Sequence, residues 1–298
     1  MKPPTFLSLL IAASCVATIA HAEARKKNPT SKMYVADEVG QVQIDTGTEI
    51  DDLTKKSVYN AEGTAIQTKP NSNASVVLSN GTGVFFDVNT RVKIRTFQQE
   101  SFRPNRDDIE DEPSLSRTQL YVDHGVIGVS TSKLVAGSTM VYETSLATAF
   151  IRGRQAVIVA QDNLTVISMV QGEATVQAGP LDKPHLVKNR QQIVIRPGKK
   201  DEQNIVEIQD IPGGGDEDDS AWLEERVETA DAARKLVYFS TQARPGDGGS
   251  IALFDGAVGA GSGTDSAGNS GNEIVPVPVA PASPPVQPNV SPANLTSK

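Results

Sequence analysis

The chain has 298 residues, a formal net charge of −8 at pH 7 and a pI of about 5.0. Nucleic acids and anionic membrane surfaces attract proteins through Lys and Arg side chains, so this acidic balance disfavours both as principal partners. Hydrophobic residues make up 38% of the chain and aromatic residues 5%, which allows a lean β-rich core in one large domain or two smaller ones.

Residues 1–22 have the features of a secretory signal peptide. Lys2 supplies a positive charge, an apolar stretch occupies residues 6–19, and Ala20-His21-Ala22 places small residues where a signal peptidase reads them. We therefore predict cleavage after Ala22 and a periplasmic or extracellular location. The alternative is an uncleaved anchor, but the apolar stretch is shorter than the roughly 20 residues that span a bilayer.

Cys15 is the only cysteine in the chain, and it lies within the predicted signal peptide. The mature chain would then contain no disulfide, no thiolate metal site and no cysteine nucleophile. A lipoprotein modified at Cys15 is an alternative, although residues 12–15 make a poor lipobox. No second apolar stretch of spanning length follows, so we predict no membrane span after signal removal. Residues 23–33 are polar and basic, and we predict that they are disordered.

Residues 34–210 show the pattern of an all-β domain. Ala74, Val76 and Leu78 alternate with a second set of side chains, and the tight-turn dipeptide Asn80-Gly81 follows them. Further strands are predicted at 83–88, 92–96, 118–122, 126–130, 140–144, 147–152, 155–160, 164–170, 174–177, 191–196 and 205–208, with turns at 89–90, 123–125, 153, 162–163 and 171–172. Several strands are apolar on both faces, as in a sandwich, barrel or solenoid.

Residues 98–117 interrupt this pattern with a polar stretch that carries both charge signs, which predicts a surface loop. Its carboxylates are Asp107, Asp108, Glu110, Asp111 and Glu112. Oxygen ligands of this kind favour Ca²⁺, but the stretch lacks the residue order of a helix–loop–helix calcium site. We therefore interpret it as a solvated loop.

The composition changes at residues 212–219, which are rich in glycine and then acidic. Asp219 or Ser220 suits the N-cap of a helix, and acidic residues favour its positive end. A stripe of Leu223, Val227, Ala230 and Arg234 has helical spacing. We predict one amphipathic helix over residues 218–239.

Trp222 is the only tryptophan in the chain. Tryptophan is enriched among the anchors of protein interfaces, but near the start of an amphipathic helix it more commonly packs on the neighbouring domain, and we favour that interpretation. Residues 244–298 are rich in Gly and Ser and then in Pro, which predicts a disordered tail. An apolar patch at residues 251–254 would pair locally or dock on a partner.

The strand region resembles the FecR-domain family. The resemblance covers residues 39–198, in the segments 39–42, 63–68, 73–82, 89–94, 120–128, 141–159 and 172–176. The most specific segment is 141–159, where the family has Thr-Pro, an apolar strand ending in Arg-Gly-Thr, and a second apolar strand. Ser145 stands here in place of the family's Pro, and Arg154 in place of its Thr. At residues 189–191, Asn-Arg-Gln replaces a common Gly-Gln.

The resemblance implies an all-β domain of short strands, either solenoid-like or a flattened sandwich. In well-known family members this domain is the periplasmic part of a membrane-bound anti-sigma regulator that senses an outer-membrane transporter. Those proteins carry a cytoplasmic helical segment and a transmembrane helix before the domain, and neither pattern is found in this sequence. We therefore expect a free-standing exported member, to which the sigma-regulator mechanism is not transferred.

The sequence offers few residues for catalysis. His124 falls in a predicted turn and His185 in a predicted loop, without the spacing of a metal pair. The nearest serine-nucleophile pattern, at residues 259–263, lies in the low-complexity tail without a preceding strand. Arg152 is either a ligand contact or, as we favour, a buried or rim side chain that bonds turn carbonyls or a carboxylate, with Gly153 supplying the turn. We predict no catalytic, cofactor-binding or metal-binding residue, and no enzyme activity.

The leading hypothesis is a non-enzymatic envelope protein whose FecR-type domain binds an envelope protein or a cell-wall polymer. A second hypothesis is a signalling component that acts in trans with a membrane regulator. A third is a carbohydrate-active enzyme on a β-solenoid, which requires two carboxylates facing each other in a groove.

Overall fold

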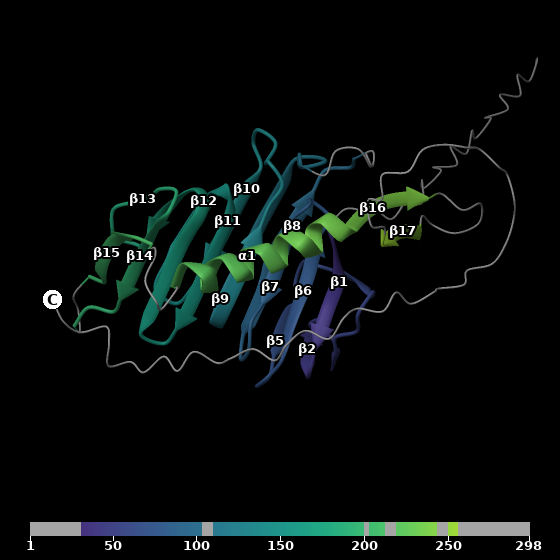
Figure 1. Ribbon diagram of the computed structural model, residues 1–298, viewed down its shortest axis with the longest axis horizontal. Helices are drawn as coiled ribbons and strands as arrows, with labels where there is room; N and C mark the ends of the chain where they lie inside the picture. The colour runs from purple at the N-terminus through teal and green to yellow at the C-terminus, as the bar shows by residue number, and fades with distance from the viewer. Residues whose placement is uncertain (1–30, 103–109, 200–202, 212–218, 243–249, 256–298) are drawn as a thin grey trace, which may run out of the picture. The chain divides into compact units, whose positions relative to one another are not determined.

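The structure is a computed structural model, and it describes residues 31–102, 110–199, 203–211, 219–242 and 250–255. All of these lie within the first of two compact units, residues 1–257. Within these residues the fold is all-β with one helix near their C-terminal end, as the sequence predicts (Figure 1). The predicted signal peptide lies outside the described residues.

Three long strands organise the fold because each belongs to two sheet layers. They are β9 (Ser116–Ser130), β11 (Thr148–Gln161) and β12 (Leu164–Gln177). The first half of β9 pairs with β8 and β10, whereas its second half pairs with β7 and β11. The two layers are therefore halves of one continuous 15-stranded sheet that folds over on itself.

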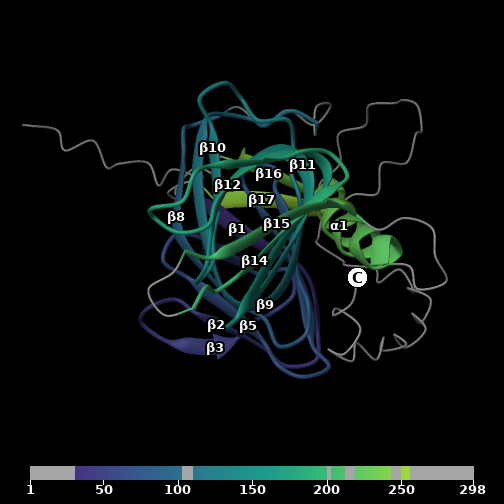
Figure 2. The ribbon, with the colours of Figure 1, turned by 90° about the vertical axis from the view of Figure 1, so that its left-hand side faces the viewer.

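We call the first layer the helix-side layer. Its order is β4 (Val58–Asn60), β1 (Lys32–Val39), β6 (Asn73–Leu78), β7 (Gly83–Phe86), the second halves of β9 and β11, the first half of β12, β14 (Gln191–Arg196) and β15 (Ile205–Asp210). All of its pairs are antiparallel. Its outer face is covered by the helix α1 (Asp219–Leu236), which Figure 2 shows outside this layer and on the opposite side from β8.

We call the second layer the open layer. Its order is β3 (Ile50–Asp52), β2 (Val42–Asp45), β5 (Ala65–Thr68), β8 (Arg91–Gln99), the first half of β9, β10 (Thr139–Glu143), the first half of β11, the second half of β12, and β13 (His185–Val187). The pairing of β9 with β10 is parallel, and the others are antiparallel. Of the two architectures left open by the sequence, the structure is the flattened sandwich.

Bends replace three of the predicted turns. The turns predicted at 123–125, 153 and 171–172 are wrong, because β9, β11 and β12 run through these positions and only bend from one layer into the other. Gly125 and Gly172 have φ values of +100° and +108°, which glycine adopts without strain. Gly153 pairs with Gly172, and a Cβ on Gly172 would lie 2.2 Å from the Cα of Gly153. Glycine at a bulge lets a strand bend sharply while its hydrogen-bonded ladder continues. The residues predicted as turns are therefore the places where the long strands bend from one layer into the other.

The main core fills the space between the two layers. Alternate residues of the strands enter it, so Val76 on β6, Leu120 on β9 and Ile158 on β11 all contribute and are almost fully buried. The intervening residues of the helix-side layer, such as Val77 and Val157, are buried beneath α1 instead. This double burial explains why those strands are apolar on both faces. Met33 is also buried in this core, which corrects the prediction of disorder at residues 32–33, where β1 begins.

The segment after the sandwich confirms the predicted helix and corrects part of the predicted tail. The helix begins at Asp219 and ends at Leu236. It is followed by β16 (Val237–Gln242), which pairs with β17 (Ser250–Asp255). The apolar patch at 251–254 therefore pairs locally, whereas the rest of the predicted tail lies outside the described residues. Within the described part of the chain, no helix has the length and apolar character needed to cross a membrane.

Candidate binding face

Two glycines bring α1 into direct contact with the sheet. A Cβ on Gly83 would lie 2.1 Å from the backbone oxygen of Ala230, and a Cβ on Gly128 would lie 2.5 Å from the backbone oxygen of Arg226. No larger residue fits at either position without moving the helix, because the nearest atoms belong to the helix backbone. The helix stripe predicted from Leu223 to Arg234 faces this seat, and all four of its side chains are buried.

Arg226 fastens the first half of α1 to the sheet. Its Nε and Nη2 atoms donate to Oδ2 of Asp87 at 2.8 and 2.5 Å, and both side chains are largely buried, with 12% and 15% exposed. The guanidinium also lies 3.8 Å from the centroid of the Trp222 ring. Trp222 packs beside Val157 and Leu223 rather than standing free, as predicted. Such a pair is geometrically specific because arginine presents its donors in a planar fork.

Arg234 fastens the second half of α1 through a buried polar cluster. Its Nε donates to Asp231 Oδ1 at 2.8 Å and its side chain is only 3% exposed. Ser130 Oγ donates to the same Asp231 oxygen at 2.8 Å, and Lys235 Nζ lies 2.5 Å from Oδ2. Burial alone would raise the pKa of Asp231, but hydrogen bonds from Lys235 and Ser130 and the charge of Arg234 outweigh it and lower that pKa.

The acidic loop takes part in this cluster instead of being merely solvated. Glu110 pairs with Arg154 and lies 3.5 Å from Arg234, and the hydrogen bond from Arg154 lowers the pKa of Glu110. Glu112 is 4% exposed and accepts hydrogen bonds from the Ser116 hydroxyl and from the backbone N–H of Val135. The prediction of a solvated loop is therefore wrong for Glu112, which is buried, whereas Glu110 keeps 54% of its side chain exposed while it pairs with Arg154. Asp107 and Asp108 lie outside the described residues.

The outer face of the open layer, which we call the open face, carries no helix among the described residues. Strand register places Val141, Phe150, Thr175 and Leu186 in one row, on adjacent strands β10, β11, β12 and β13. Directly paired residues project to the same side of a sheet. Phe150 is 47% exposed and Leu186 is 49% exposed, so the row presents apolar side chains to the outside.

A polar network adjoins this row on the same face. Gln119 donates from Nε2 to Glu143 Oε1 at 2.7 Å, and Glu143 also pairs with Arg95. The Arg95 guanidinium lies 4.1 Å from the centroid of the Tyr121 ring and covers it. The network is anchored on three neighbouring strands, so its side chains are held in position by one another.

The charge of the open face differs from that of the whole chain. Its outward cations are Arg91, Lys93, Arg95, Arg117 and Arg152, and its outward anions are Asp45, Asp52, Asp123, Glu143 and Glu173. Cations and anions therefore balance on this face, whereas the chain as a whole has a formal charge of −8. Arg152 is exposed and pairs in register with Glu173. The predicted buried or rim role for Arg152 is wrong, because β11 continues through Gly153 and its alternation turns Arg152 outward.

The two histidines of the predicted mature chain make separate local pairs. The ring Nδ1 of His124 lies 3.1 Å from Asp123 Oδ2, and Nε2 of His185 lies 2.9 Å from Asp182 Oδ2. Burial would raise the pKa of Asp182, but the His185 contact and two backbone N–H donors lower it. In the part of the chain that the structure describes, no group of three or more His, Cys, Asp or Glu side chains is placed to hold a metal ion. The serine pattern at 259–263 lies outside that part.

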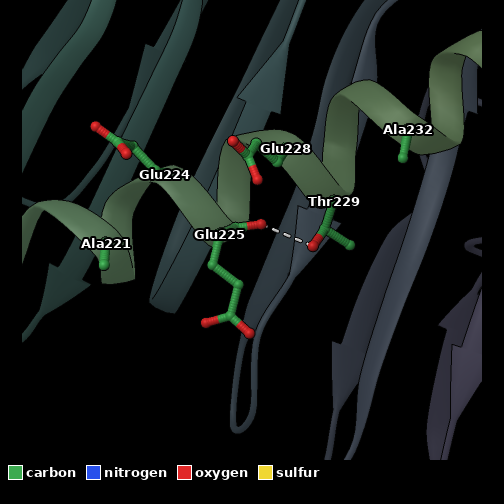
Figure 3. A pocket seen from close by; sticks show the side chains of 6 residues that line it. All are labelled: Ala221, Glu224, Glu225, Glu228, Thr229 and Ala232. Carbon is green, nitrogen blue, oxygen red and sulfur yellow. Dashed lines mark hydrogen bonds between the residues drawn. The ribbon is translucent and has the colours of Figure 1, made fainter. Parts of the chain in front are cut away.

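A hollow on α1 is lined by several glutamates whose carboxylates do not point toward a common centre (Figure 3). It is lined by Ala221, Glu224, Glu225, Glu228, Thr229 and Ala232. Figure 3 shows the three glutamate side chains pointing in different directions, while the Thr229 hydroxyl donates to the backbone oxygen of Glu225 at 2.7 Å. Acid–base hydrolysis of a glycoside needs two carboxylates on opposite sides of one bond. The carboxylates of this hollow do not offer that arrangement.

Comparisons with known proteins give a distant structural likeness. No protein-family model and no curated protein matches the chain. Two crystal structures of a "putative anti-sigma factor" from Parabacteroides distasonis ATCC 8503 are similar to it, each with a TM-score of 0.38. The match to the first structure has 15% sequence identity and covers 49% of this chain and 60% of the other chain. The match to the second has 14% identity and covers 55% of this chain and 74% of the other chain. Neither likeness assigns a mechanism or partner to this chain.

Proposed function

We propose that the chain is a non-enzymatic protein of the bacterial envelope that binds a partner protein through the open face. The observation that carries this proposal is the contrast between the two faces of the sandwich. The helix-side face is occupied by α1, which two glycines and two buried arginines hold in place. The open face keeps an apolar row at Phe150 and Leu186 accessible.

The chemistry of the open face indicates the kind of partner. Protein interfaces commonly combine an apolar anchor with a polar rim, and here the row is bordered by the network around Arg95 and Glu143. Because charges of both signs border the row, at Arg95 and Glu143, we expect the partner surface to present an apolar side chain flanked by charged groups of both signs.

A protein fits this face better than a cell-wall polymer. Glycans are held by exposed aromatic rings together with free hydrogen-bonding groups. Phe150 offers such a ring, but the polar groups of Gln119 and Glu143 are already paired, and the Tyr121 ring is covered by Arg95. The remaining anchors, Phe150 and Leu186, form an aliphatic and aromatic row suited to a protein side chain. We therefore expect a protein partner, and binding of a cell-wall polymer is the alternative result of the test.

The proposal is tested by a crosslinking pull-down from the envelope fraction of the source organism. The chain carrying Phe150→Ser and Leu186→Ser should lose a protein that the unchanged chain retains. The matched control is Val39→Ser on β1, because Val39 is also 49% exposed but lies in the helix-side layer. The control should retain the partner.

Three outcomes distinguish the hypotheses. If the double variant loses one defined protein and the control keeps it, the open face is supported as the binding surface. A membrane regulator among the crosslinked proteins would favour signalling in trans. Recovery of wall polymer by all variants favours polymer binding elsewhere. Equal recovery of the protein partner by the double variant and the control shows that the open face is not the binding surface.

A further inference from the structure

Strand β15 forms a free edge of the helix-side layer among the described residues. Among the described residues it pairs only with β14, in a register that is unbroken from Ile205 to Asp210. The strand contains no proline, no lysine and no bulge, three of the features that prevent an edge strand from pairing with another chain, and its charged side chains are Glu207 and Asp210. Ile205 is 60% exposed and Ile208 is 40% exposed.

The hydrogen bonds of β14 with β15 fix which backbone groups point outward. The N–H of Ile211 donates to the backbone oxygen of Arg190 at 2.8 Å, just beyond the ladder. In an antiparallel pair, hydrogen-bonded and non-hydrogen-bonded positions alternate. The odd-numbered residues Ile205 to Gln209 therefore bond to β14, whereas Val206, Ile208 and Asp210 turn their N–H and C=O groups toward the free edge.

We propose that a second copy of this chain pairs with this edge, antiparallel to it, with Ile208 on the two-fold axis. In that register the N–H of Val206 donates to the carbonyl of Asp210 in the partner copy, and Ile208 exchanges both of its hydrogen bonds with its own copy. The same bonds repeat by symmetry, as in any interface that uses the same patch on both subunits. The two helix-side layers then form one continuous sheet.

The side chains of β15 are complementary to themselves in this register, which is why a second copy is the occupant. Ile208 faces its own copy, Ile205 faces Ile211, and Glu207 faces Gln209. No carboxylate stands directly opposite another carboxylate, so the like-charge pairs that destabilise cross-strand neighbours are avoided.

The pairing also covers an apolar rim of the core. Ile208 pairs in register with Ile193 of β14, a fully buried core residue. The Ile208 side chain therefore lies on the core side of the sheet, and it remains 40% exposed only because the layer stops at β15. This edge belongs to the helix-side layer, so the inference is independent of binding at the open face.

The experiment measures association of the chain from Glu23 to Lys298 by sedimentation equilibrium over a wide concentration range. We expect a monomer–dimer equilibrium. Ile208→Lys places two like charges opposite each other on the axis and should weaken dimerisation at least about tenfold. Ile208→Pro removes an N–H that points outward while keeping the bonds to β14, and should have the same effect. The matched control Ile50→Lys, at an isoleucine that is 65% exposed on β3, should leave the equilibrium unchanged.

A crosslinking variant keeps the test decisive if the charged variant misfolds. The chain from Glu23 to Lys298 contains no cysteine, so Ile208→Cys in it should give a covalent dimer with a short bifunctional maleimide, and Ile50→Cys should not. Wild-type chains that stay monomeric at every concentration overturn the proposal. A dimer that survives both Ile208→Lys and Ile208→Pro, with native circular dichroism, also overturns it, because the dimer then uses another surface.

Discussion

Replacing Gly83 with alanine should loosen α1 from the sheet. The new Cβ would lie 2.1 Å from the backbone oxygen of Ala230, so the helix must withdraw by about 1 Å to restore a van der Waals distance. Inserting a methyl group into a packed contact costs about 1–3 kcal/mol. Withdrawal also weakens the packing of Val227 and Leu223, which α1 buries against the sheet. We therefore expect the free energy of unfolding to fall by about 2–3 kcal/mol.

Trp222 makes this loosening measurable because it is the only tryptophan and lies on α1. Urea unfolding followed by its fluorescence should show a lower midpoint for Gly83→Ala and a red-shifted native emission. The control is Gly47→Ala, where no atom lies within 4 Å of the added Cβ and only the φ of +83° is strained. That strain costs about 1–2 kcal/mol and should leave the native emission unchanged. Unaltered stability and emission in Gly83→Ala would refute the account of the helix seat.

Three further outcomes follow from the same contacts. Arg234→Met should lower the free energy of unfolding, measured by urea titration, by about 3–5 kcal/mol. The reason is that Asp231 stays largely buried beside Ser130 but loses its arginine. Adding Asp231→Asn should recover part of the lost stability. The pKa values of Asp231 and Glu110 are lowered in the folded chain, so the unfolded chain binds protons more readily than the folded one. The free energy of unfolding should therefore be at its full value at neutral pH and decline as the pH falls below about 4. The decline should be shallower in Asp231→Asn. Gly172→Ala should cost more than about 2 kcal/mol, since it combines a φ of +108° with a Cβ placed 2.2 Å from the Cα of Gly153, and a thermal unfolding midpoint equal to wild type would contradict the corner geometry.

The sequence pattern predicted local elements well where one physical signal dominated. The alternation at Ala74, Val76 and Leu78 and the turn at Asn80-Gly81 gave the β6–β7 hairpin correctly. The stripe from Leu223 to Arg234 predicted both the helix and its buried side. Double-sided burial of strands was also predicted from their composition, although the sequence did not show that α1 covers the second side.

The corners of the sandwich were not predictable from local signals. Glycine has the same freedom at a reversing turn and at a bend, so Gly125 and Gly172 favour both interpretations equally. The partners of a strand decide between them, and those partners are distant in sequence: Gly125 pairs with Ala160, beyond the bend. Arg152 was misjudged for the same reason, since its direction depends on the strand continuing through Gly153.

The apolar row of the open face could not be predicted from the sequence, because its residues are brought together only by the pairing of strands. Phe150 and Leu186 come from strands separated by β12, and only the pairings of Thr175 with both place them in line. The contact between α1 and the sheet could have been predicted from two glycines in the sequence. Gly83 begins β7 and Gly128 lies within β9, and glycine in a strand indicates a close approach of another backbone.

The most direct test of the central claim places a photo-crosslinking amino acid at position 150 of the chain in its native cells. The account predicts that irradiation yields a discrete adduct with one protein, and that the same amino acid at position 39 does not. An adduct from position 39 but none from position 150 would contradict the claim that the open face is the binding surface.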